Sequence, residues 1–188
     1  MGEICTGSEA AVRQALALDK SRQTQGLAVL AAAVCGNAKL SMPLGEELSR
    51  KYPEDTLVQE VYVPLSKAFV ALAAGHDQEA IAAAEPAKPN DANFPASYLQ
   101  GLAYLELHDG ARAVNAFEAA KRARSGAAMN TFFPPFWAQV QLGLARAYAM
   151  AGNKVEARKA YDAFFAIWKN ADGDLPMLVA AKKEYAAL

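Results

Sequence analysis

The sequence holds few of the side chains that enzymes use as nucleophiles, general bases or metal ligands. Its two histidines, His76 and His108, each stand next to an aspartate in a segment with the composition of a turn. A catalytic or metal site needs several such groups that converge in one pocket, and no GxSxG, HExxH or Walker-type motif occurs. We therefore predict that both histidines are solvent-facing turn residues, and we predict no catalytic residue, metal ion or cofactor.

The two cysteines, Cys5 and Cys35, are separated by 30 positions and belong to no CxxC motif or Cys/His cluster. This spacing indicates neither a zinc site nor a disulfide framework. We predict that both are small side chains of the core.

Charge argues against two classes of partner. The chain has 19 basic and 20 acidic residues, which does not give the positive field that phosphate backbones or anionic lipids attract. The densest basic group, Lys121, Arg122 and Arg124, lies at the end of a predicted helix, where cations complement the helix dipole. No apolar run approaches the roughly 18 residues of a membrane span. We predict no nucleic-acid partner and no direct membrane insertion, and the compartment is not indicated.

Four aromatic residues crowd the connection 125–135 and the start of the next predicted helix: Phe132, Phe133, Phe136 and Trp137. Two interpretations stay open. The side chains either fill the seam between two helix pairs or form an exposed aromatic lip that binds a ligand.

The elements that position these residues follow from internal repetition. Segment 97–120 places small and large residues at the offsets of tetratricopeptide repeats, namely Gly101, Tyr104, Ala113, Phe117 and Ala120. The offsets recur around Ala145 and, less completely, around Ala68 and Val29. Small residues let antiparallel helices cross closely, and large rings fill the gap beside them. We therefore expect an all-α, tetratricopeptide-like solenoid of antiparallel helix pairs.

Turn residues and prolines set the expected boundaries. They predict helices at 8–20, 23–35, 40–51, 56–74, 77–85, 95–107, 110–124, 135–151, 154–169 and 175–187. These form a single domain, 1–188, with four hairpins at roughly 23–51, 56–85, 95–124 and 135–169, an N-terminal orphan helix and a C-terminal cap at 175–187.

Three stretches carry a family resemblance: FPASYLQGLAYL from Phe94, LGLARAYA from Leu142 and ARKAYDAFFAIWKNADGDLP from Ala157. They resemble the C-terminal tetratricopeptide region of the eukaryotic-like serine/threonine protein kinases of Acidobacteria and of related winged-helix regulators. The resemblance implies a sensory or docking module on a kinase or regulator, on either side of a membrane. The kinase's own Gly-rich loop, HRD and DFG motifs are absent from this sequence.

The sequence thus favours a non-catalytic scaffold, the tail of a larger signalling protein, that binds a protein or peptide. The alternative is a small-molecule sensor or enzyme fragment that uses a cavity between helix pairs. The repeat offsets turn six residues of the first helices outward, here called the predicted interaction face: Tyr62, Phe69, Tyr98, Glu106, Gln139 and Arg146. For Tyr62 and Phe69, packing against the neighbouring hairpin is the competing interpretation.

The predicted helix 8–20 carries apolar Val12, Leu16 and Leu18 but has no first helix to complete its hairpin. A solenoid repeat cannot bury its apolar face alone. We expect this end to expose an uncapped surface, and the chain to self-associate or fray there, whereas the cap at 175–187 stays ordered.

Overall fold

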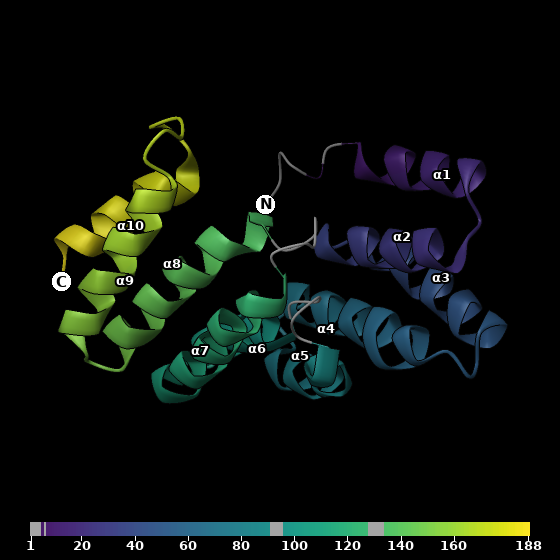
Figure 1. Cartoon of the computed structure of the whole chain (residues 1–188), viewed down its shortest axis with the longest axis horizontal. Coiled ribbons are helices and arrows are strands. Elements are labelled where there is room, and N and C mark those ends of the chain that lie inside the picture. Colours follow the sequence, from purple (N-terminus) through teal and green to yellow (C-terminus); the bar gives the residue numbers. More distant parts are fainter. Residues whose placement is uncertain (1–4, 6, 91–95, 128–133) are drawn as a thin grey trace. The chain divides into compact units, whose positions relative to one another are not determined.

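The computed structural model describes residue 5 and residues 7–90, 96–127 and 134–188, except for the side chains of 124–127 and 134–136. Within these residues every regular element is a helix (Figure 1). The predicted all-α class is thereby confirmed for the described chain. The chain consists of two compact units, Met1–Asn90 and Asp91–Leu188, which are described separately.

Unit 1 contains the helices α1 (Ser8–Leu18), α2 (Arg22–Val34), α3 (Ala38–Lys51), α4 (Val63–Ala73) and α5 (Asp77–Ala84), with a π-helix η1 (Leu57–Tyr62) before α4 and a 3-10 helix η2 (Glu85–Asn90) after α5. Each of α1–α2, α2–α3 and α4–α5 packs as a neighbouring pair, and α2 also packs against α4.

One predicted helix of unit 1, at 56–74, is divided into η1 and α4. Pro64 stands in the first turn of α4 and has no N–H to donate to the carbonyl of Glu60. The backbone before it widens to π-helical geometry, a form that occurs as a local bulge within α-helices.

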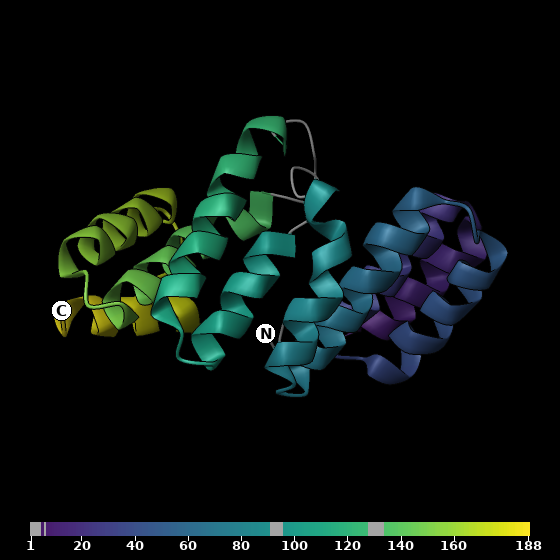
Figure 2. The same ribbon diagram turned by 90° about the horizontal axis from the view of Figure 1, so that it is seen from below.

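Unit 2 contains α6 (Ala96–Glu106), α7 (Gly110–Ala127), α8 (Pro134–Met150), α9 (Lys154–Ile167) and α10 (Pro176–Ala186). Helices α6 and α7 run side by side, as Figure 2 shows, and α8 packs against both α7 and α9. Helix α10 covers part of α9. The predicted boundaries agree to within a few residues, with α7 longer than expected.

The turns α2–α3, α4–α5, α6–α7 and α8–α9 each contain one residue with a left-handed backbone conformation. Gly36, Gly75 and Gly152 have φ of 68°, 75° and 78°, and His108 takes the same left-handed conformation with φ of 55°. Such a residue ends a helix by turning its last carbonyls toward backbone donors. Both histidines are exposed in these turns, as the sequence predicts.

One close crossing of helices in unit 2 is built on a single aromatic ring. Phe117 of α7 is fully buried and lies against Gly101 of α6 and Gly143 of α8. A Cβ at Gly101 would come within 2.8 Å of the ring, and one at Gly143 would come closer still. The contact agrees with the expected roles of Gly101 as a small residue and of Phe117 as a ring that fills the gap, whereas the repeat offsets did not identify Gly143.

The cysteines contradict the sequence prediction. Cys5 and Cys35 form a disulfide, with their Cα atoms 5.4 Å apart, and both are half-buried. Because α1 and α2 are antiparallel, the residue just before α1 lies beside the residue that ends α2. The prediction of two separate core thiols is wrong because the 30 intervening positions span this helix pair.

Replacement of Gly143 by Ala should test the crossing at Phe117. The added methyl group must displace a buried ring, so overpacking should exceed the gain in helix propensity and lower the free energy of unfolding by about 1–2 kcal/mol. Urea denaturation measures this change. Gly173→Ala is the matched control, because no atom lies within 4 Å of its added Cβ. Equal stability of the two variants would contradict the described crossing.

The disulfide can be tested by replacing both cysteines with serine. Loss of this cross-link should lower the free energy of unfolding by about 2–4 kcal/mol, because the unfolded chain regains conformational freedom. Thermal denaturation with and without a reductant should show the same decrease in the wild-type protein. A peptide map without reduction that finds Cys5 and Cys35 as free thiols would contradict the pairing.

Candidate functional site

The structure separates the predicted interaction face into buried and accessible residues. Tyr62 and Tyr98 are only 3% and 5% exposed, Phe69, Gln139 and Arg146 are half-buried, and Glu106 is exposed. Tyr62 covers Gly26, and Tyr98 packs edge-on against Phe117. Tyr98 therefore packs inward, contrary to its predicted outward orientation, whereas the burial of Tyr62 agrees with the competing interpretation, in which it packs against the neighbouring hairpin.

Two residues of the predicted interaction face lie in unit 1 and four in unit 2. Among the four, the hydroxyl of Tyr98 in α6 donates to Oε1 of Gln139 in α8, at 2.6 Å. Burial raises the pKa of this phenol well above its usual range, although the positive charge of Arg146 opposes the shift. Tyr98 is therefore a neutral hydrogen-bond donor at physiological pH and cannot serve as a base.

Arg146 belongs to a second polar group, here called the Arg146 cluster, with Tyr161 and Glu184. Nε and Nη2 of Arg146 in α8 donate to the two carboxylate oxygens of Glu184 in α10, each at 2.9 Å. The Tyr161 hydroxyl in α9 donates to Oε2 of Glu184 at 2.7 Å. One carboxylate thus joins three helices through a forked geometry that arginine is shaped to provide.

The electrostatics of the Arg146 cluster favour its charged form. Partial burial alone would raise the pKa of Glu184, but the hydrogen bonds from Arg146 and Tyr161 and the charge of Arg146 outweigh it and lower the pKa. Burial, together with the hydrogen bond to Glu184 and its charge, raises the pKa of Tyr161 beyond its usual range. The cluster therefore stays an ion pair with a neutral phenol at physiological pH.

Aromatic packing surrounds the Arg146 cluster. Tyr161 stacks on Phe165 with ring centroids 6.2 Å apart, and Tyr185 of α10 meets both rings edge-on, at 5.9 and 5.7 Å. The guanidinium of Arg158 lies over the Tyr185 ring, at 5.3 Å from its centroid. These contacts hold α10 against α8 and α9, while the side chain of Arg146 remains 38% exposed.

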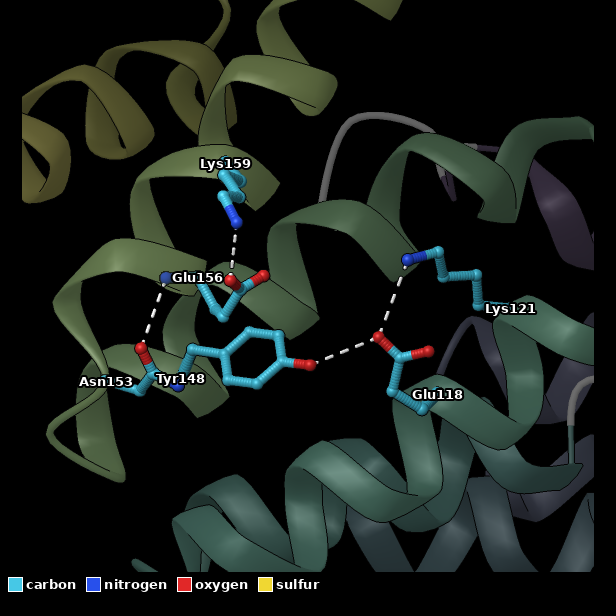
Figure 3. Close-up of polar contacts among 6 residues, drawn as sticks. All are labelled: Glu118, Lys121, Tyr148, Asn153, Glu156 and Lys159. Carbon is cyan, nitrogen blue, oxygen red and sulfur yellow. Dashed lines mark hydrogen bonds and ion pairs between the residues drawn. The ribbon is translucent and has the colours of Figure 1, made fainter.

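A further polar contact joins α7 and α8, and α9 carries an ion pair of its own (Figure 3). The Tyr148 hydroxyl donates to Oε1 of Glu118 at 3.2 Å, and Lys121 Nζ lies 3.5 Å from the same oxygen. On α9, Lys159 pairs with Glu156 at 2.7 Å. Burial, followed by the charge and hydrogen bond of Glu118, raises the pKa of Tyr148. Each carboxylate has its own cation on the same helix, an arrangement that contributes little stability and leaves no free base.

The predicted aromatic lip is described only at Trp137. Phe132 and Phe133 lie outside the described residues, as does the side chain of Phe136. Trp137 is half-buried and packs against the core of unit 2, as the seam-filling interpretation expects for this residue. The lip as a whole stays a prediction.

Sequence reasoning did not identify Tyr161 and Glu184 as partners of Arg146. The 38 positions that separate Glu184 from Arg146 carry no periodic signal. Only the packing of α10 brings the two charges together.

A metal-binding cluster and a membrane-spanning helix are both absent from the part of the chain that the structure describes. No three His, Cys, Asp or Glu side chains there lie close enough to hold a metal ion. No described helix combines the length and the apolar character needed to cross a membrane.

Comparison with known proteins supplies no relative. No protein-family model matches this chain, and no curated protein or solved structure is significantly similar to it.

The pH dependence of unfolding tests the Arg146 cluster. Since the pKa of Glu184 is lowered in the folded state, its contribution to stability is complete above the ordinary value of 4.5 and is lost as the pH falls through the folded value. Glu184→Gln retains the shape without the charge, so its free energy of unfolding should fall less than that of the wild type between neutral pH and about pH 3. The other carboxylates are common to both proteins, so parallel curves would contradict the ion pair.

Proposed function

We propose that this chain is a non-catalytic scaffold that binds a protein or peptide ligand. The observation that carries the proposal is the packing of consecutive helices as antiparallel pairs around close crossings, together with half-exposed polar side chains on α8. Helix-pair arrays of this kind present long surfaces to partners and need no catalytic group to act.

A tetratricopeptide-like solenoid is the arrangement we propose for these pairs. The left-handed residue in the turns α2–α3, α4–α5, α6–α7 and α8–α9 supports it, as does the wedge of Phe117 between Gly101 and Gly143.

The origin of the chain in a signalling protein is a further part of the proposal. It rests on the resemblance of the segments from Phe94, Leu142 and Ala157 to the tails of bacterial serine/threonine kinases. A sensory or docking tail of this type places its partner close to the enzyme that acts on it.

The Cys5–Cys35 disulfide is informative about the cellular compartment in which the protein resides. Disulfides persist in oxidising environments and are rare where thiols are kept reduced. We therefore favour an extracytoplasmic location for the scaffold, with Cys5–Cys35 as the supporting observation.

A small-molecule sensor remains the second candidate, because unit 1 contains a cavity of about 370 Å³ between α3 and α4. Its lining includes Ser49, Arg50, Ser66 and Lys67, and cavities of this size accept small ligands. The lining also contains Glu46, so Arg50 and Lys67 give this cavity a net positive charge that would favour an anionic ligand. A thermal-shift screen of small anions tests this second candidate.

The scaffold proposal is tested by affinity capture with the purified chain as bait, followed by mass spectrometry. The variant Glu106→Lys changes an exposed residue of the predicted interaction face, and we expect at least a tenfold loss of the captured partner. Lys159→Glu, an exposed change on α9, is the control and should retain it. Equal recovery by both variants would exclude this face as the binding surface.

A further inference from the structure

An apolar groove runs between α1 and α2 in unit 1. It has a volume of about 520 Å³ and is lined mainly by small and aliphatic side chains, with no charged residue among them. Helix α1 contributes Ala11, Val12 and Ala15, and α2 contributes Leu27, Ala28 and Ala31. We call this feature the α1–α2 groove.

Equivalent grooves elsewhere in the chain are filled by a helix. Helix α2 packs against both α3 and α4, and α6 packs against both α7 and α8. Helix α2 thus contacts the junction between α3 and α4, and α6 contacts the junction between α7 and α8. Each junction consists of the second helix of one pair and the first helix of the next pair. Helices α1 and α2 form the same kind of junction, but no described helix fills its groove.

The filling helices reveal the chemistry that such a groove accepts. The main-chain carbonyl of Val29 in α2 accepts a hydrogen bond from Ser41 of α3 at 3.0 Å, and Val29 also lies against Gly45. Helix α6 brings Gly101 against Phe117 of α7. Helix α2 buries only small and aliphatic residues, which allow close approach of the backbones, whereas α6 buries Gly101 and Ala103 beside larger side chains such as Tyr98.

The surface beside the groove carries an unexplained exposed side chain. Leu18 at the end of α1 is 81% exposed, the most exposed of the large hydrophobic residues that the structure describes. It follows Ala11 by seven positions and Ala15 by three, so helical periodicity places it on the same stripe of α1. A helix that fills the groove would cover this stripe.

The walls of the groove are held in place at both ends. The Cys5–Cys35 disulfide joins the start of α1 to the end of α2. At the other end, Asp19 accepts hydrogen bonds from the backbone N–H of Ser21, at 2.8 Å, and from its hydroxyl, at 2.7 Å. Val12 anchors the floor by packing with Ala28, Ala32 and Leu40. A groove fixed in this way loses little conformational freedom when it binds.

From these observations we propose that the α1–α2 groove binds an amphipathic α-helix of a partner protein, whose buried face consists of alanine, glycine and aliphatic residues. The inference goes beyond the proposed function, because the groove shares no residue with the predicted interaction face. It also gives the disulfide a role, which is to keep the two walls of the binding groove together.

A labelled peptide with the α2 sequence, residues 21–34, is the probe, because α2 fills the equivalent groove on α3 and α4. Fluorescence anisotropy with the full-length chain should show saturable binding, and a scrambled peptide of the same composition should not bind. Ala15→Arg places a long cation in the groove and should weaken binding at least tenfold. Ala31→Arg tests the opposite wall, and Ala17→Arg, exposed but outside the lining, should bind as the wild type does.

Circular dichroism and melting temperature establish that each variant is folded, and either wall variant suffices for the test. Absence of peptide binding to the wild type, or unchanged binding to a folded wall variant, overturns the proposal. A concentration-dependent dimer in sedimentation that Ala15→Arg abolishes also overturns it, because a second copy then occupies the groove. The variant Glu106→Lys should bind the peptide normally, so failure of this proposal is distinguishable from failure of the scaffold function.

Discussion

The close approach of helices in unit 2 depends on the contact of one ring with two glycines. Phe117 occupies the space that a Cβ at Gly101 or Gly143 would need, so three helices meet around a single side chain. Tyr98 packs on the edge of that ring and from there reaches Gln139. The positions of the polar groups on α8 therefore follow from this crossing, because the helix that carries them is held against Phe117.

The first and the last described helices, α1 and α10, are held in place by different kinds of interaction. Helix α10 is held by the carboxylate of Glu184 and by aromatic rings, so non-covalent contacts suffice to cover α9. Helix α1 buries only Val12 completely, and a disulfide compensates for this small apolar contact. Weak packing and a covalent link occur together because a helix with little buried surface loses too much conformational entropy to stay in place unaided.

The sequence predicted those features that depend on residues close together in the chain. Glycine and asparagine in the turns, small residues at the crossing of Gly101 with Phe117 and the all-α class follow from short-range spacing. It did not predict the Cys5–Cys35 pair or the contact of Arg146 with Glu184, because both join distant positions through packing. The inward orientation of Tyr98 also escaped prediction, because its contact with Phe117 depends on how α6 and α7 pack together.

The π-helix before α4 has a consequence for how this chain tolerates changes in length. A π-helical turn contains about one residue more than an α-helical turn of similar rise, so η1 accommodates a surplus residue between Thr56 and Val63. Deletion of one position there would convert the segment to a regular turn and rotate everything that precedes it by about 100°. The ring of Tyr62 would then leave Gly26, and the phase between the first two helix pairs would change. The surplus residue thus sets the angular relation between neighbouring helix pairs.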